Sequence, residues 1–89
     1  MTTELPLFPD GGPSFDVLPH PHVVFDGSTP LIKETCVPVR RIWSFHRRGV
    51  PIATIMARYP QIRPGAILDA LSFAYDNESF IEWDLRQDS

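Results

Sequence analysis

The chain has 89 residues, a length that allows one small domain with tails. A hydrophobic share of 43%, with two Trp, two Tyr and six Phe, is enough for a folded core and excludes a fully disordered chain. The single cysteine excludes an internal disulfide framework, and no stretch indicates a signal peptide or a membrane span, so we expect a cytoplasmic protein.

The net charge of −3 conceals three blocks of opposite sign. Residues 30–63 contain seven Lys or Arg and one Glu, a net +6. Residues 1–29 contain four acids (−4), and residues 64–89 contain six acids and one Arg (−5). A basic segment between acidic flanks favours an anionic partner, of which nucleic acid is the obvious candidate. Arginines that only solvate the outer face of a helix explain the same pattern equally well.

The first 20 residues mix Pro, Gly and acids without a helical or strand period, which predicts an extended, flexible arm over residues 1–20. Its isolated apolar residues favour docking on the protein's own domain or on another chain, while an untethered tail fits the composition too. In residues 22–37, the turn signal Asp26-Gly27-Ser28 separates two runs rich in Val, Ile and Phe. This pattern predicts a short β-hairpin or a pair of extended segments.

Three apolar-periodic segments separated by proline breaks predict three short helices. They run from about Pro38 to Gly49, from Pro51 to Arg58, and from Pro64 to about Asp76-Asn77. The positions expected to be buried are Val39, Ile42, Trp43 and His46 in the first helix, Ile52, Ile55, Met56 and Tyr59 in the second, and Ile67, Ala70, Leu71 and Ala74 in the third. Three short helices packed at steep angles are typical of a helix-turn-helix domain, which we place at residues 21–77, followed by a C-terminal tail at residues 78–89. The spacing in the tail fits a strand, a helical turn or a docking peptide equally well.

The segment TPLIKETCVPV, followed by IWSFHRRGVPIATIMARYPQIRPGAILDALSFAY, resembles the domain of unknown function 433 family, whose members are widely described as predicted antitoxins. Members usually carry a Lys-Pro-x-Ile-x-Gly-Thr-Arg-Ile-Pro-Val segment, a helix ending in Gly, a helix ending in Tyr-Pro and a third helix of the Ala-Leu-x-Tyr-Ala kind. The matching positions, within residues 21–75, are Pro30, Ile32, Thr35, Pro38, Val39, Gly49, Tyr59, Pro60, Ala70, Leu71 and Tyr75.

The resemblance implies a mainly α fold with a three-helix, homeodomain-like helix-turn-helix core preceded by a short β-hairpin or extended strands. It also implies a role as an antitoxin or regulator, often with a PIN-like ribonuclease as partner. The chain departs from the family pattern at Glu34, where Gly is usual, and at Cys36, where Arg is usual. Val50 and Arg63 stand where a hydroxyl would cap the second and third helices.

The third helix carries Asp69 and Asp76, which oppose contacts with phosphate. If DNA is bound, we therefore expect the phosphate contacts to come mainly from the first helix. The expected DNA-binding residues are Lys33, Arg40, Arg41, Arg47, Arg48 and Arg63. A homodimer would double these contacts.

Apolar side chains outside the predicted buried stripe of the third helix, together with those of the tail, form the expected partner-binding surface. These residues are Leu68, Phe73, Tyr75, Phe80, Ile81, Trp83 and Leu85. Their acidic surroundings suit a basic protein partner such as a ribonuclease. The same residues could instead close the domain's own small core or a homodimer contact.

Candidate catalytic or metal-binding side chains are few: His20, His22, Cys36 and His46, without the spacing of a zinc site. We therefore expect no enzyme activity, no metal and no cofactor. The predicted function is an antitoxin-like regulator, a homodimer that binds and neutralises a partner toxin, with operator DNA as a second ligand. The alternative is a protein-binding adaptor, or a subunit of a larger complex, that does not bind DNA.

Overall fold

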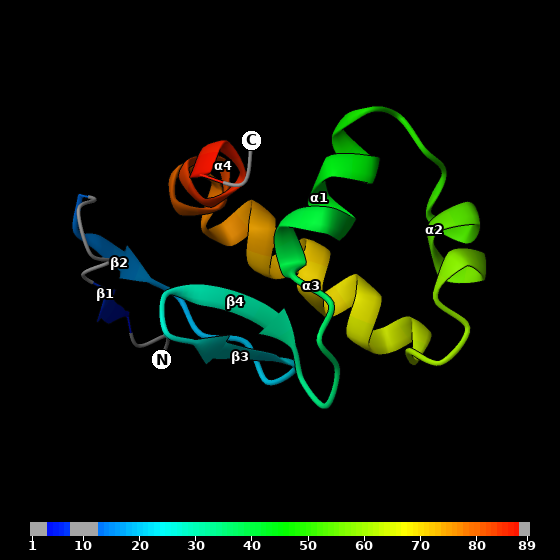
Figure 1. Cartoon of the computed structure of the whole chain (residues 1–89), viewed down its shortest axis with the longest axis horizontal. Helices are drawn as coiled ribbons and strands as arrows, with labels where there is room; N and C mark the ends of the chain where they lie inside the picture. The colour runs from blue at the N-terminus through cyan, green and yellow to red at the C-terminus, as the bar shows by residue number, and fades with distance from the viewer. Residues whose placement is uncertain (1–3, 8–12, 88–89) are drawn as a thin grey trace.

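The computed structural model describes residues 4–7 and 13–87 and arranges them in four helices and two small antiparallel strand pairs (Figure 1). The helices are α1 (Val39–Arg47), α2 (Ile52–Arg58), α3 (Pro64–Asp76) and α4 (Glu78–Gln87), and the strands are β1 (Leu5–Leu7), β2 (Phe15–Val17), β3 (Val23–Asp26) and β4 (Thr29–Ile32). Short strands therefore precede helices, as the sequence predicts. None of the helices in the described residues reaches the length and apolarity needed to cross a bilayer.

Proline and glycine set the limits of the first three helices. Pro38 and Pro51 directly precede α1 and α2, and Pro64 is the first residue of α3. Proline fits this position because the first N–H groups of a helix have no partner within the helix, so the missing N–H of proline costs no hydrogen bond. Gly49 follows α1 with φ 85°, a left-handed conformation that a side chain disfavours. All three predicted helices are confirmed to within about two residues at each end.

The tail predicted over residues 78–89 folds as the helix α4 as far as Gln87, and residues 88–89 lie outside the described part. The helix packs against α1 and α3 because Phe80 and Ile81 on one of its faces are buried. The sequence left a strand, a helical turn or a docking peptide open for this segment, and the structure has a helix of ten residues.

The strands form two separate pairs. The predicted hairpin is confirmed: β3 pairs antiparallel with β4, Val23 lies opposite Ile32, and Gly27 in the turn has φ 62°. The arm predicted over residues 1–20 is extended where it is described, but β1 pairs with β2, with Leu5 opposite Val17. Residues 1–3 and 8–12 of that predicted arm lie outside the described residues.

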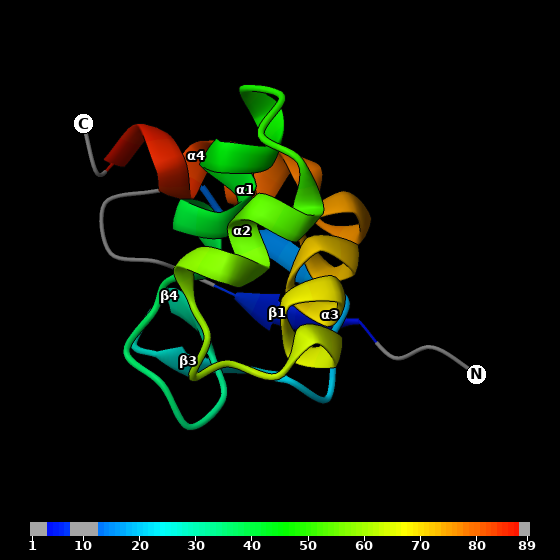
Figure 2. The same ribbon diagram turned by 90° about the vertical axis from the view of Figure 1, so that its right-hand side faces the viewer.

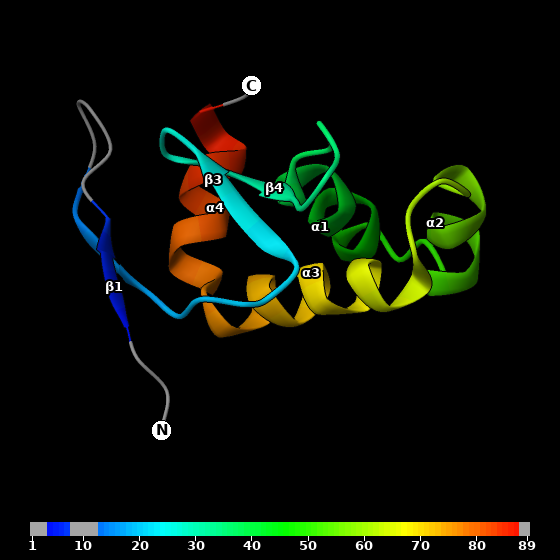
Figure 3. The same cartoon turned by 90° about the horizontal axis from the view of Figure 1, so that it is seen from below.

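Helix α3 packs against α1, α4 and the β3–β4 hairpin. It runs along one side of the molecule from the α2 end to the α4 end (Figure 3), and α1 packs across it. The β3–β4 hairpin covers another side of α3, and seen from the α2 end it lies beside that helix (Figure 2). The core that these elements share contains Ile32, Val39, Ile42, Trp43, Ile55, Ile67, Ala70, Leu71, Phe73, Ala74, Phe80 and Ile81.

Most of the side chains that were predicted to be buried on the three helices are buried in the structure. In α1 the first three predicted positions are buried and His46 is half-buried, and all four predicted positions of α3 are buried. In α2 only Ile55 is buried, and Ile52 is exposed. The prediction for Phe73 is wrong: its side chain is fully buried, because α3 is covered on the α1 side and also by the rings of His20 and Phe25.

Candidate functional site

Two of the six expected DNA-binding residues pair with carboxylates of α4. The Nη1 atom of Arg40 lies 3.2 Å from Oδ2 of the buried Asp84. Arg47 forms an ion pair with Glu82, which also accepts a hydrogen bond of 3.3 Å from Trp43 Nε1. Arg40 and Arg47 are seven residues apart and so share one flank of α1, the flank that faces α4. Their charges are largely offset, which the sequence did not reveal because the tail was not predicted as a packed helix.

The other four expected cations, Lys33, Arg41, Arg48 and Arg63, are exposed. Within residues 4–7 and 13–87, no ion pair joins any of them to a carboxylate. The basic character predicted for the middle of the chain therefore resides in these side chains and in Arg58.

Arg58 is a basic residue that the sequence prediction left out of the site. Its guanidinium carbon lies 5.0 Å from the centre of the Phe45 ring, and that of Arg48 lies 5.2 Å from the same centre. We call this cluster the Phe45 arginine pair. Its members come from α1, from the residue after α1, and from the last residue of α2. The sequence places Arg58 at the end of a helix, but only the path of the turn at Gly49 brings that end back to Phe45.

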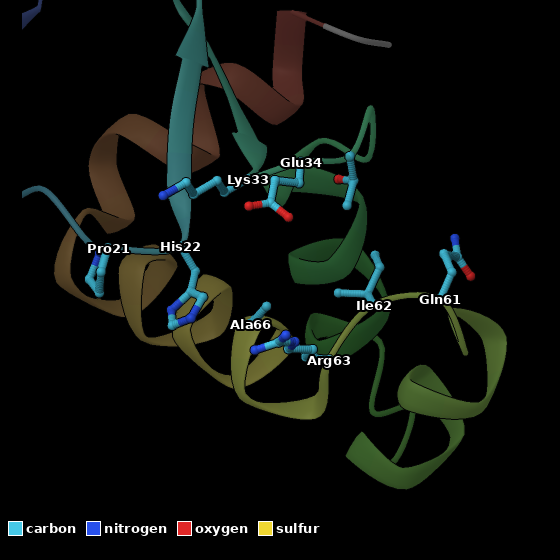
Figure 4. Close-up of a pocket in the computed structure, with 9 residues that line it drawn as sticks. Pro21, His22, Lys33, Glu34, Gln61, Ile62, Arg63 and Ala66 are labelled. Carbon is cyan, nitrogen blue, oxygen red and sulfur yellow. The ribbon is translucent and has the colours of Figure 1, made fainter.

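A cavity of about 420 Å³ lies between the segment after β4 and the start of α3 (Figure 4). Its walls are formed by Pro21, His22, Lys33, Glu34, Thr35, Gln61, Ile62, Arg63 and Ala66. The carboxylate of Glu34 points into the cavity, and His22 and Arg63 line the opposite side (Figure 4). The guanidinium of Arg63 and the carboxylate of Glu34 on facing walls can bind a ligand that offers both acceptors and donors.

The loop at the cavity is held by Thr35. Its Oγ1 donates to the carbonyl of Ile32 at 2.7 Å and accepts the N–H of Val37 at 3.1 Å. Within this loop Glu34 has φ 66°, in the left-handed region that glycine tolerates best. Glycine, the residue of the family pattern at this position, adopts this conformation without strain, so Glu34 is a strained residue beside a cavity.

Two histidines of the segment before β3 bind the two acids of α3. His20 Nδ1 lies 2.7 Å from Asp69 Oδ1, and His20 Nε2 lies 2.7 Å from Asp76 Oδ2. His22 approaches Asp69 Oδ2 with its Nδ1 at 3.1 Å and donates its backbone N–H at 2.9 Å. We call these four residues the histidine clamp. Because both ring nitrogens of His20 face carboxylate oxygens, both must donate, which requires the protonated imidazolium.

The pKa values of His20 and Asp69 shift in the directions that this geometry requires. Partial burial lowers the pKa of His20, but the hydrogen bonds and charges of Asp69 and Asp76 outweigh it and raise the pKa above 6.5. Partial burial likewise raises the pKa of Asp69, and the hydrogen bonds from His20 and His22 together with the charge of His20 lower it below 3.8. The two acids of α3 are thus engaged by the chain's own histidines.

Asn77, which follows α3, fastens the same segment through its amide. Its Oδ1 accepts the N–H of Leu18 at 2.7 Å, and its Nδ2 donates to the carbonyls of Leu18 at 3.0 Å and Phe73 at 2.9 Å. Asn77 is buried, so these bonds are shielded from water. Of the two docking modes predicted for the arm, the described part docks on its own domain.

One comparison with known proteins gives a match. A family model described as "Protein of unknown function (DUF433)" covers residues 26–74, more than half of the chain. The chain belongs to the DUF433 family. No curated protein and no solved structure matches it.

The DUF433 segment ends before α4 and begins at the last residue of β3. The carboxylates that pair with Arg40 and Arg47, and the histidines that bind the acids of α3, therefore lie outside the matched segment. The cavity, the Phe45 arginine pair and the exposed face of α3 lie largely or wholly within it.

The expected partner-binding surface is only partly exposed. Phe80 and Ile81 are buried with Phe73, so these three side chains build the chain's own core and offer no surface. Trp83 and Leu85 are half-buried. Leu68 and Tyr75 are accessible, with 46% and 56% of their surfaces exposed. The alternative interpretation, in which these side chains close the domain's own small core, is therefore confirmed for Phe73, Phe80 and Ile81.

The four candidate catalytic or ligating side chains do not assemble. His20 and His22 belong to the histidine clamp, His46 Nε2 hydrogen-bonds the Tyr75 hydroxyl, and Cys36 is exposed. Within the described ranges, no group of three or more His, Cys, Asp or Glu side chains is arranged to hold a metal ion.

Proposed function

We propose that this DUF433 protein is a non-enzymatic regulator of the antitoxin type, which binds and neutralises a partner toxin through the exposed face of α3. The observation that carries the proposal is the α3 stripe, formed by Gly65, Leu68, Ser72 and Tyr75. All four residues are exposed, and their spacing of three and four residues places them on one side of the helix. The stripe contains no charged side chain.

An uncharged stripe on this helix favours protein over DNA as its ligand. If α1 to α3 form a homeodomain-like core, α3 is the helix that would enter the major groove. Affinity for DNA comes largely from cations that neutralise phosphates, and the stripe supplies none. Tyrosine is instead enriched at the centres of protein interfaces, and Tyr75 lies two turns from the exposed Leu68 on the same side of the helix. A PIN-like ribonuclease is the partner class that the family resemblance suggests.

Operator DNA is a second ligand in this proposal, with the regulator acting as a homodimer in the cytoplasm. Since Arg40 and Arg47 pair with α4, the phosphate contacts fall to the exposed cations Lys33, Arg41, Arg48 and Arg63. The histidine clamp supports this reading, because it offsets the acids of α3 that would otherwise repel phosphate.

The proposal implies a PIN-like ribonuclease encoded beside this protein, and the test is neutralisation of that enzyme. Nuclease activity is measured on a single-stranded RNA with increasing amounts of the purified protein, its Leu68→Glu variant and its Leu5→Glu variant. Leu5 is a matched control, since it is an equally large, 49% exposed side chain on β1. A charge at the centre of an interface costs about 2 kcal/mol or more, so Leu68→Glu should inhibit at least about 30-fold more weakly while Leu5→Glu inhibits normally. Full activity of the nuclease at a molar excess of the unmodified protein would refute the proposal.

The alternative is a protein-binding adaptor without DNA contacts. The ion pairs of Arg40 and Arg47 favour it, because they remove two of six expected phosphate contacts. A gel shift with the protein's own promoter at two salt concentrations separates the two candidates. Salt-sensitive binding supports the regulator, and absence of binding at low salt favours the adaptor.

A further inference from the structure

The Phe45 arginine pair brings two like charges to one aromatic ring. The guanidinium carbons of Arg48 and Arg58 lie 5.2 Å and 5.0 Å from the ring centre. Both side chains are exposed, and in the part of the chain that the structure describes no carboxylate forms an ion pair with either of them. Arg40 and Arg47, on the α4 flank of α1, differ from this pair, because carboxylates offset their charges, whereas residues 4–7 and 13–87 offer Arg48 and Arg58 no counter-ion.

The two guanidinium groups are held in place before any ligand arrives. The Nε of Arg48 donates to the carbonyl of Ser44 at 3.2 Å, which leaves its two terminal amino groups for an external acceptor. Phe45 itself packs half-buried against the core and gives both arginines a fixed face on which to stack. Each arginine also lies at the carboxyl end of a helix, where the partial negative charge of the backbone carbonyls stabilises cations.

We infer that the Phe45 arginine pair binds the phosphodiester backbone of nucleic acid. The inference rests on the nucleic-acid part of the proposed function, and it assigns that part to the ends of α1 and α2. Two cations that each lie within 5.2 Å of one centre are at most about 10 Å apart, a distance of roughly three phosphate-to-phosphate intervals of about 3.4 Å along one strand. A polymer of closely spaced anions therefore fits the pair better than a single carboxylate does.

The chemistry of the pair also selects phosphate. A guanidinium group is planar and always charged, and it binds phosphate oxygens through two parallel hydrogen bonds. Contacts of this kind go to the backbone and do not read bases, so binding through the pair is independent of sequence. Because the pair uses no residue of α3, the α3 stripe stays available for a protein partner.

The test is the salt dependence of binding, measured by fluorescence anisotropy with a labelled 20-base-pair DNA duplex and a single-stranded RNA of 20 nucleotides between 20 and 200 mM NaCl. The variants are Arg48→Gln, Arg58→Gln and the double substitution, since glutamine keeps part of the stem that packs on Phe45. Arg47→Gln is the matched control, because it removes the same charge from the residue next to Arg48, but from a group paired with Glu82. Thermal melting by circular dichroism confirms that each variant is folded.

Each substitution in the pair should reduce the slope of log K against log salt by about 0.9 on the duplex, or by about 0.7 on the single strand, and the double variant by twice as much. The nucleic acid on which each substitution produces the full expected reduction of the slope is the one that the pair serves. Arg47→Gln should leave the slope unchanged. The inference is overturned if the double variant keeps the slope of the unmodified protein, if neither nucleic acid binds at 20 mM NaCl, or if a polyglutamate peptide binds as tightly with the same dependence on Arg48 and Arg58. Toxin neutralisation by the double variant is measured in parallel, so failure here is distinguishable from failure of the proposed function.

Discussion

Replacing Asn77 with alanine should detach the N-terminal segment from α3 and destabilise the whole chain. The amide of Asn77 makes three hydrogen bonds, of 2.7, 3.0 and 2.9 Å, and two of them serve the backbone of Leu18. Alanine can replace none of them. Because the side chain is only 7% exposed, water cannot reach these groups while the segment stays docked.

The magnitude follows from the number of bonds. A net contribution of about 1 kcal/mol for each hydrogen bond gives a loss of about 3 kcal/mol in the free energy of unfolding. In a domain of this size, each kcal/mol shifts the melting temperature by about 4–8 °C, so Asn77→Ala should melt about 12–24 °C lower. Asn77→Asp is the matched comparison: it keeps the acceptor for the Leu18 N–H but turns a carboxylate toward two carbonyl oxygens, so it should be at least as unstable at pH 7.

Urea denaturation followed by tryptophan fluorescence measures the loss, and hydrogen exchange of the Leu18 amide reports the local detachment. In Asn77→Ala the Leu18 amide should exchange faster, and the increase in its rate measures how much more often the segment opens. In Asn77→Asp, protonation of the carboxyl at acidic pH restores a hydrogen-bond donor. The difference in the free energy of unfolding between this variant and the unmodified protein should therefore become smaller. A loss below about 1 kcal/mol, with an unchanged exchange rate at Leu18, would show that the amide does not hold the segment.

Three further predictions concern other parts of the molecule. The pKa of His20 is raised in the folded chain, so the stability that His20 contributes is full below about pH 6.5 and is lost as the pH rises through the folded pKa. The lowered pKa of Asp69 adds stability above pH 3.8, and this stability is lost on further acidification. The free energy of unfolding should therefore fall between pH 6 and pH 9, and His20→Gln should flatten this decline; parallel curves for both proteins would contradict the clamp. Glu34→Gly should leave the free energy of unfolding unchanged or raise it by up to about 1 kcal/mol in calorimetry. Glycine relieves the strain of the left-handed conformation, but it also adds entropy to the unfolded chain, which offsets part of this gain. A clear loss of stability would mean that Glu34 is not strained at φ 66°. Phe73→Ala should cost about 3–5 kcal/mol as a core truncation, and Leu68→Ala less than about 0.5 kcal/mol as a surface change; similar losses in urea denaturation would refute the assigned burial.

The local features of this chain are fixed by its local sequence. Proline at positions 38, 51 and 64 and glycine at positions 27 and 49 limit which backbone conformations neighbouring residues can adopt, so three helices and a hairpin were predictable with nearly correct limits. Apolar spacing likewise identified the faces of α1 and α3 that are buried. The left-handed conformation of Glu34 was not predicted, because the sequence showed only that Glu stands where the family pattern has Gly.

Which surfaces meet was decided only by the tertiary structure. The contacts that give the candidate site its character join residues far apart in sequence: 44 residues for Arg40 and Asp84, 49 for His20 and Asp69, and 59 for Leu18 and Asn77. Periodicity gives the face of a helix but not the element that covers it, so it predicted neither the burial of Phe73 nor the pairing of two arginines with α4. Charge counted along the chain therefore located a basic segment, while packing determined which of its cations remain available to a partner.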